Sequence, residues 1–399
     1  MFQKLKRHIK YRLYSPALYA VDIALTNLKK VSVSGHRKPQ AIQSNKLLRA
    51  LIVTDGESYT SQMQFAPFFA HRKALRLRFG FVFKQMLLED ALRHTNAIRG
   101  FDLIFVKLLF TRQDAQAQKI IKHIHAAKGQ TKLIYFDGDD DVCIQWPDIF
   151  PYLDLYVKKH VFSDRDQYGR TFVGKSNLTD YVASRWGVSF ADNIIPNSKP
   201  LSPEQRDKLF LGYNLVLDDN IRKLYIANLA AKNILPKEND VVCRATVAPN
   251  TWLYHLRKDV TPKLQALTPK YKVLMPIKRV PQKEYYREML SSKICISPFG
   301  YGEICWRDFE AILCRCLLIK PDMAHIRTFP DIFVPNQSYV PVKWDFSDLN
   351  EKCAYYLEHD DERESIVDHA YRIVADYYRN DSFIELFADM FERLDLVHL

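Results

Sequence analysis

The chain has 399 residues, of which 47% are hydrophobic and 13% aromatic, and its formal net charge at pH 7 is +12. This length suits two domains, and the composition excludes a low-complexity or fibrous chain. Because no run of 18 apolar residues occurs, the sequence predicts no membrane-spanning helix. The excess of positive charge favours anionic partners, namely nucleic acid, an acidic membrane surface or phosphorylated substrates, without choosing among them.

Two features bear on the compartment. The seven cysteines are odd in number and form no C-x-x-C pair, which is typical of free thiols in a reducing cytoplasm. The basic N-terminus lacks the apolar core and cleavage site of a signal peptide. We therefore expect a cytoplasmic protein.

Residues 1–30 combine many cations with an apolar helical face formed by Phe2, Leu5, Ile9 and Leu13. A basic amphipathic helix of this kind can lie on an anionic membrane surface, which would place the protein at the inner face of the membrane. The alternative is that this helix packs against the protein's own fold. Residues 31–45 form a polar linker, so residues 1–45 are expected to precede the first lobe.

Residues 46–200 alternate apolar runs with helical patterns. Strands are predicted over 47–54, 101–110, 132–141 and 152–161, with helices up to residue 74 and over 113–128. Strands that alternate with helices indicate a parallel, Rossmann-like sheet. We therefore expect a first α/β lobe in this region.

Acidic residues gather at two predicted strand ends of this lobe: Asp137, Asp139, Asp140 and Asp141 at one, and Asp55 and Glu57 at the other. One hypothesis for the first group is a Mg²⁺ or Mn²⁺ site, because hard cations prefer oxygen ligands. A second is a general base or a contact to acceptor hydroxyls, for which Asp55 and Glu57 are rivals. A third is helix capping with solvated charge.

Basic residues lie at the ends of three further predicted strands. Lys158 and Lys159 end the fourth strand of the first lobe, where they would meet phosphate or an acidic sugar. Residues 201–236 are largely helical and would bridge to a second lobe over 237–380. In that lobe Arg244 and Lys278 follow predicted strands, and the final segment, 381–399, is predicted to be a helix that crosses back to the first lobe.

Residues 291–321 read strand, glycine-containing loop, helix and strand, which is the unit of a parallel α/β sheet. Gly300 and Gly302 would allow close approach of a ligand. Arg307 lies in the first helical turn, where an anion is favoured, and Glu310 lies one turn further on, suited to two hydroxyl groups. The alternative is a surface Arg/Glu pair of little consequence.

The string GYGEICWRDFEAILCRCLLIKP resembles the donor-binding segment of GT-B glycosyltransferases, in the style of the bacterial exostosin-like and CgeB-like groups. The resemblance implies that Arg307 faces the donor phosphate and Glu310 the sugar or ribose hydroxyls. Glu303 is similar to the first acid of the E-x7-E pattern, one residue short. Arg315 stands where those families usually have glycine.

The resemblance implies two Rossmann-like lobes that face a cleft, with Gly300, Gly302, Glu303, Arg307, Glu310, Arg244 and Lys278 holding a nucleotide-sugar donor. Asp139, Asp140, Glu57 and Asp55 are the candidate bases, and Asp141, Lys158 and Lys159 would contact a glycan or lipid-linked acceptor. We expect metal-independent sugar transfer to a hydroxyl of a bacterial surface glycan, such as lipopolysaccharide or capsule, and no nucleic-acid partner. The alternative is a non-catalytic protein of the same fold that binds nucleotides or polyanions.

Overall fold

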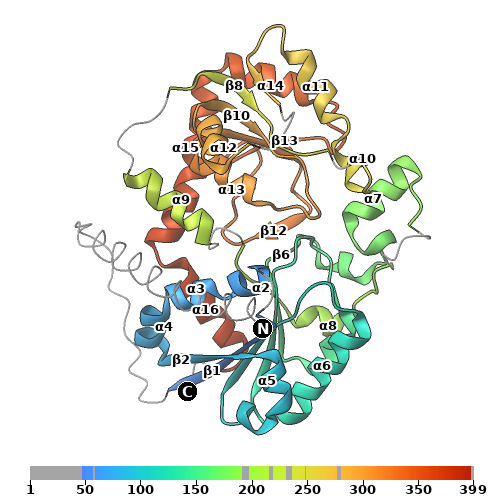
Figure 1. Ribbon diagram of the computed structural model, residues 1–399, viewed down its shortest axis with the longest axis vertical. Coiled ribbons are helices and arrows are strands. Elements are labelled where there is room, and N and C mark those ends of the chain that lie inside the picture. The colour runs from blue at the N-terminus through green and yellow to red at the C-terminus, as the bar shows by residue number, and fades with distance from the viewer. Residues whose placement is uncertain are drawn as a thin grey trace.

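The computed structural model describes residues 47–56, 59–190, 197–214, 219–230, 236–247, 249–275 and 280–396. Within these ranges the chain forms two lobes, one above the other in Figure 1, each built on a parallel sheet. The predicted α/β fold with two Rossmann-like lobes of GT-B type is thereby confirmed. The predicted basic amphipathic segment, residues 1–45, lies outside the described residues.

The first lobe has, in the described part of the chain, a six-stranded parallel sheet of order β2-β1-β3-β4-β5-β7. Its strands are β1 (Leu48–Thr54), β2 (Phe81–Leu87), β3 (Leu103–Lys107), β4 (Lys132–Asp137), β5 (Leu155–Lys158) and β7 (Leu209–Leu211). Every residue of β3 is buried, as expected of a central strand that is covered on both faces. The sequence analysis missed β2 and β7, which lie at the two edges and are only half buried.

Short helices connect these strands. They are α2 (Tyr59–Gln64), α3 (Ala66–Ala70), α4 (Arg72–Phe79), α5 (Leu88–Arg93), α6 (Asp114–Ala127), α7 (Asn177–Trp186) and α8 (Pro203–Asp207), with 3₁₀ turns η1 (Thr95–Ile98), η2 (Pro147–Tyr152), η3 (Arg165–Gly169) and η4 (Val173–Lys175). The helix predicted up to residue 74 is therefore three short helices. Gly80 ends α4 in the left-handed conformation, with φ 62°, which glycine adopts without strain.

The second lobe has a five-stranded parallel sheet of order β13-β11-β10-β8-β9 among the described residues. Its strands are β8 (Asn239–Val242), β9 (Val273–Leu274), β10 (Ser292–Ile296), β11 (Leu317–Pro321) and β13 (Val340–Val342). Alternate residues of β10 enter different cores, because successive side chains of a strand point to opposite faces. Ile294 and Ile296 pack with Leu317 and Ile319, whereas Cys295 joins the core on the other face.

The helices of the second lobe are α9 (Asp219–Ala230), α10 (Leu253–Arg257), α11 (Val260–Leu267), α12 (Gln282–Leu290), α13 (Trp306–Leu313), α14 (Leu349–Glu358) and α15 (Asp360–Arg379). The helix predicted within residues 291–321 is α13, which begins at Trp306 and ends at Leu313. Arg315, in the turn that follows, has φ 56°, which non-glycine residues rarely adopt. Its guanidinium lies 3.7 Å from the centre of the Tyr371 ring and 2.5 Å from Asp368 Oδ1, contacts that a glycine could not make.

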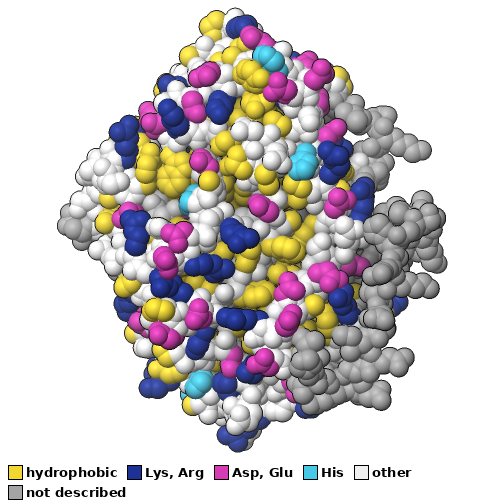
Figure 2. Space-filling view, turned by 180° about the vertical axis from the view of Figure 1, so that it is seen from behind, with side chains coloured by type: hydrophobic (Ala, Val, Ile, Leu, Met, Phe, Trp, Pro, Cys, Tyr) yellow, Lys and Arg dark blue, Asp and Glu magenta, His cyan; other side chains and the backbone are white. Residues whose placement is uncertain are grey.

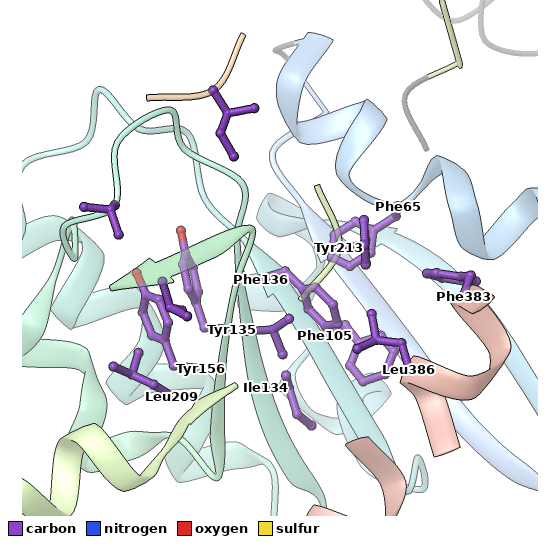
Figure 3. Packing of buried hydrophobic residues seen from close by; sticks show 14 of the residues in the cluster. Phe65, Phe105, Ile134, Tyr135, Phe136, Tyr156, Leu209, Tyr213, Phe383 and Leu386 are labelled. Atoms are coloured by element: carbon purple, nitrogen blue, oxygen red, sulfur yellow. The ribbon is translucent and has the colours of Figure 1, made fainter. Parts of the chain in front are cut away.

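The last helix, α16 (Ser382–Arg393), packs against the first lobe. Figure 3 shows Phe383 and Leu386 of this helix beside Phe65, Phe105 and Phe136 of the first lobe. The Phe68 ring lies 5.5 Å from Phe383 and 4.7 Å from Phe387, both edge to face. The core of the first lobe therefore includes side chains of α16, which follows the second lobe in the sequence.

The surface carries both signs of charge. On the face seen in Figure 2, Lys and Arg side chains are scattered among Asp and Glu and do not gather in one stripe. No helix in the described ranges is long and apolar enough to cross a membrane.

Phe68 tests the contribution of α16. The substitution Phe68→Ala should lower the free energy of unfolding by about 3–5 kcal/mol, because it removes a fully buried ring and leaves a cavity between α3 and α16. Urea denaturation measures this loss. The neighbouring Phe69, which is 37% exposed, provides the control, and Phe69→Ala should cost much less. Equal losses in the two variants would contradict the packing described above.

Candidate functional site

A short antiparallel ribbon joins the two lobes. β6 (His160–Phe162) of the first lobe pairs with β12 (Ile326–Thr328) of the second, with His160 opposite Thr328 and Phe162 opposite Ile326. The Ser163 backbone N–H continues the ribbon by donating to the His325 carbonyl at 2.9 Å. The predicted strand over 152–161 is therefore two strands, β5 in the sheet and β6 in the ribbon.

Gly302 marks the closest approach of the lobes beside this ribbon. A Cβ atom at Gly302 would lie 1.7 Å from the Asp140 carbonyl oxygen and 2.5 Å from the Asp141 nitrogen, so no other residue fits. The sequence analysis explained this glycine by the approach of a ligand. The structure gives a different reason, since the loop after β4 occupies the space that a side chain would need.

Glu303 follows Gly302 and is fully buried at the same junction. Its Oε2 accepts a hydrogen bond from the Val142 backbone N–H at 3.0 Å and lies 3.2 Å from His160 Nε2. Its Oε1 lies 3.6 Å from His325 Nε2. We name this group of Glu303, His160, His325 and the Val142 N–H the Glu303 clasp. It links the second lobe, through Glu303 and His325, to the first.

The charge state of the clasp follows from its surroundings. Burial alone would raise the pKa of Glu303, but the hydrogen bond with His160 and the nearby His325 ring outweigh it and hold that pKa well below its usual range. Burial lowers the pKa of His160 to about 4, although Glu303 opposes this shift. At neutral pH the clasp therefore consists of an ionised carboxylate and a neutral His160 imidazole. The sequence predicted a donor contact for Glu303, whereas these contacts already engage its carboxylate.

Two arginines flank the glycine loop. Arg307, in the first turn of α13, lies 3.4 Å from Ser297 Oγ and 3.9 Å from Cys305 Sγ, and no described carboxylate lies within ion-pairing distance. Arg257, at the end of α10, is only 9% exposed and donates to the carbonyls of Phe299 at 2.6 Å and Thr246 at 2.7 Å.

Arg307 is close enough to Arg257 to affect its pKa. Burial, followed by repulsion from Arg307, lowers the pKa of Arg257 to about 10. A Cβ atom on Gly300 would lie 3.7 Å from Arg257 Nη2, so the Arg257 side chain runs beside the loop that leads to α13. Two cations near one another at the electropositive start of a helix, with no described carboxylate at ion-pairing distance, are suited to hold an anion.

The start of α13 is held in place by Asp308. Its Oδ2 accepts from the Cys305 backbone N–H at 3.0 Å, and its Oδ1 accepts from Ser297 Oγ at 2.5 Å. Nζ of the buried Lys320 lies 3.2 Å from Asp308 Oδ2 and neutralises the charge of Asp308. Since Asp308 is already neutralised in this way, its charge does not cancel that of the two arginines.

Two other residues predicted to bind the donor have protein partners. Both oxygens of Glu310 accept hydrogen bonds from tyrosines of α12, Tyr285 at 2.7 Å and Tyr286 at 2.9 Å. The Nε of Arg244 donates to Glu288 Oε2 at 2.7 Å, and a second hydrogen bond joins the same two side chains. Arg244 is thus part of an ion pair, whereas no described carboxylate lies within ion-pairing distance of Arg257 or Arg307.

The acidic end of β4 is largely neutralised by lysines. Burial would raise the pKa of Asp137, but Lys158 Nζ at 3.0 Å, Lys107 and the Tyr156 hydroxyl lower it to about 2. Lys107 Nζ also lies 2.5 Å from Asp139 Oδ1. Lys158 is fully buried in this network, so the predicted direct contact between Lys158 and an acceptor is not supported.

The next two aspartates, Asp140 and Asp141, differ in exposure and in protonation state. Asp140 has a side chain that is 62% exposed, and its Oδ1 lies 3.4 Å from Nζ of the buried Lys159, whose ammonium therefore already has a partner. Asp141 accepts a hydrogen bond from the Cys143 backbone N–H at 2.9 Å. Burial, reinforced by the neighbouring Glu303 carboxylate, raises its pKa to about 8, although Lys158 opposes the shift. Asp141 is therefore mostly protonated at neutral pH.

Three predicted site residues remain, namely Asp55, Glu57 and Lys278. Asp55 directly follows β1 and is half buried. Glu57 and Lys278 lie outside the described residues. Among the residues that the structure does describe, no group of three or more His, Cys, Asp or Glu side chains is arranged to hold a metal ion. Lys158 pairs with Asp137 and Lys107 pairs with Asp139, and these ammonium groups already neutralise the carboxylates that a Mg²⁺ or Mn²⁺ ion would bind.

Sequence reasoning missed Arg257, Lys107, His160 and His325 as parts of this site. Arg257 lies in the string YHLRKD, which has no glycine turn or strand end to single it out. His160 adjoins the predicted Lys159, but nothing in the sequence singles it out, because its partner, Glu303, is 143 residues away. No local pattern reveals such a pair.

Comparisons with known proteins bear on the second lobe and on the fold. Residues 252–389 match a family model described as glycosyl transferase-like. The predicted resemblance to GT-B glycosyltransferases is thereby confirmed, whereas the exostosin-like and CgeB-like subgroup stays a prediction. No curated protein sequence matches the chain.

Similar solved structures include an alpha-glucosyltransferase in complex with UDP and a 13-mer DNA, with 10% identity and a TM-score of 0.45 over 88% of this chain and 100% of that one. Another is Alr3699/HepE from Anabaena in complex with UDP-glucose, with 11% identity and a TM-score of 0.41 over 86% and 99% of the chains. A third is a glycosyltransferase from Rickettsia africae ESF-5, with 12% identity and a TM-score of 0.44 over 88% and 99%.

The clasp makes stability depend on pH. His160 has a pKa of about 4 in the folded protein, against an ordinary value of 6.5. Below pH 6.5 the unfolded chain gains a proton that the folded protein does not bind, so the free energy of unfolding should fall between pH 6.5 and 4. The fall is up to roughly 1.4 kcal/mol per pH unit. The variant His160→Asn should lose this part of the slope in urea denaturation at several pH values.

The exposed His123 of α6 provides the control, since His123→Asn should keep the slope of the parent protein. If His160→Asn and the parent show the same pH dependence, His160 is not held neutral by the clasp.

Proposed function

We propose that the protein is a glycosyltransferase that moves a sugar from a nucleotide-sugar donor to an acceptor hydroxyl. The observation that carries this proposal is the pair Arg257 and Arg307. Both lie beside the glycine loop at the start of α13, close to the first lobe, and among the described residues neither has a carboxylate within ion-pairing distance. Both also lie within the glycosyl transferase-like region, residues 252–389.

The chemistry of sugar transfer explains why such a pair would be useful. When the bond between the sugar and the nucleotide breaks, negative charge develops on the departing phosphate. Arg307 and Arg257 would neutralise that charge, and the first N–H groups of α13 would donate hydrogen bonds to the phosphate oxygens. Because the arginines are fixed by Ser297, Phe299 and Thr246, little reorganisation is needed when the charge appears.

The acceptor must lose a proton, and Asp140 is the best placed of the candidate bases that the structure describes. Its side chain is exposed, while its backbone contacts Gly302 in the loop that leads to the arginine pair. Asp139 is held by the buried Lys107, and Asp141 is mostly protonated at neutral pH. Asp55 lies at the end of a different strand, β1. We therefore assign the base to Asp140.

For the acceptor we propose a hydroxyl of a bacterial surface glycan or a lipid-linked precursor, without a nucleic-acid partner. The net charge of +12 suits phosphate-bearing substrates of this kind. The alternative of a non-catalytic nucleotide- or polyanion-binding protein shares the arginine pair but does not need Asp140. Turnover of a nucleotide sugar therefore separates the two functions.

The arginine pair can be tested by ligand binding. UDP, GDP and CMP should be compared in a thermal melting assay, with duplex DNA as a further arm. At least one nucleotide should raise the melting temperature, whereas DNA should not. Arg307→Gln should weaken the binding of that nucleotide by about tenfold to a hundredfold, because a charge-assisted contact to phosphate is lost.

Arg287→Gln is the matched control, since Arg287 is an exposed arginine of α12 in the same lobe. It should bind the nucleotide as the parent protein does. Unchanged binding in both Arg307→Gln and Arg257→Gln would show that the donor phosphate lies elsewhere.

Asp140 can be tested by kinetics once a donor is known. Asp140→Asn should lower the rate of sugar transfer by roughly 10²- to 10⁴-fold, the usual contribution of a general base, and leave nucleotide binding intact. Single-turnover transfer from the nucleotide sugar measures the step. A variant that transfers sugar at the parent rate would exclude Asp140 as the base.

A further inference from the structure

The helix α4 presents an unusually basic face on the side of the first lobe. Its sequence, RKALRLRF, has four cations and no acidic residue in eight positions. Arg72, Lys73, Arg76 and Leu77 are exposed, which places three of these cations and one leucine on a single face. Arg78, the fourth cation, instead pairs with Glu385 of α16. For Arg72, Lys73 and Arg76, no described carboxylate lies within ion-pairing distance.

Apolar side chains protrude among these cations. Leu77 is 66% exposed, the largest exposure among the described large hydrophobic residues, and Phe69 at the end of α3 is 37% exposed. The Phe69 ring lies 5.0 Å from that of Phe83, and the Arg72 guanidinium lies 5.3 Å from the centre of the same Phe83 ring. Phe69 and Arg72 therefore flank one ring and belong to the same surface.

We propose that this α3–α4 face, formed by Phe69, Arg72, Lys73, Arg76 and Leu77, docks on an anionic lipid surface. The cations would meet the phosphate groups of the lipids, and Leu77 and Phe69 would enter the boundary between headgroups and acyl chains. Exposed cations together with exposed apolar side chains favour a membrane over a polynucleotide. A polynucleotide backbone offers phosphate charge but no apolar layer that an exposed leucine could enter. The framework beneath is rigid, because Phe68 and Leu75 of α3 and α4 are fully buried.

This surface is distinct from residues 1–30, whose basic amphipathic pattern also suggests a membrane. It is also independent of the arginine pair in the second lobe. Failure of the proposed function would leave the inference unaffected, and the reverse also holds.

The experiment is co-sedimentation of the full-length protein with vesicles of phosphatidylcholine, alone or mixed with phosphatidylglycerol. The parent protein should bind the mixed vesicles and bind much less to phosphatidylcholine alone. The double variant Lys73→Glu/Arg76→Glu should lower the partition coefficient on mixed vesicles by roughly tenfold or more, since each cation near an anionic surface contributes several-fold.

The matched control is Lys119→Glu/Lys122→Glu on α6, which lies on the other side of the first lobe in Figure 1. Both of its lysines are exposed, and the change in net charge is the same. It should bind nearly as the parent does. An equal loss in the two double variants, or no loss in either, overturns the proposal, because binding would then follow net charge or another segment.

Leu77→Ser tests the apolar part without a change of charge. It should weaken binding about fivefold, as expected for removing a leucine that is partly inserted. Circular dichroism and urea denaturation should show that all variants keep the parent fold. Unchanged binding of Leu77→Ser also overturns the proposal, because a purely electrostatic contact does not need the protruding side chain.

Discussion

The carboxylate of Glu303 is buried between the two lobes. The residues that contact it determine how the loops around the site are placed. A buried charge is tolerated only when partners replace the water that it lost, and losing one partner typically costs about 3–5 kcal/mol. Here the first lobe supplies His160 and the Val142 N–H, and the second supplies His325. The charge therefore sets which loops of the two lobes meet, and Gly302, next in the chain, allows the backbones to touch.

Around the junction between the lobes, the charged side chains of the first lobe are paired, whereas two arginines of the second lobe lack a described carboxylate partner. In the first lobe the carboxylates at the end of β4 are matched with Lys107, Lys158 and Lys159, whose side chains are all buried. In the second lobe Arg244 is matched with Glu288, whereas Arg257 and Arg307 hold no carboxylate among the described residues. The other charged side chains of the site already have partners of opposite charge, so the proposed donor phosphate would neutralise the two arginines that lack one among the described residues.

The aspartates at the end of β4 are alike in the sequence, but the structure gives each of them a different environment. Four aspartates in five residues share one strand end, yet their environments separate them into an ionised structural group, a lysine-bound group, an exposed carboxylate and a mostly protonated acid. Burial and neighbouring charge, rather than residue type, determine which of them can accept a proton at neutral pH.

The sequence by itself determined the two α/β lobes, the strand, loop, helix and strand unit of residues 291–321, and the position of Arg307 at the start of α13, because apolar periodicity and turn residues are local signals. It did not reveal β2 and β7, the half-buried edge strands. Only the tertiary structure decided that Glu303 meets His160, that Gly302 meets Asp140 and that Arg257 joins Arg307. These contacts join residues 50 to 162 positions apart, and the pKa shifts of Glu303, His160 and Arg257 depend on burial that exists only in the folded structure.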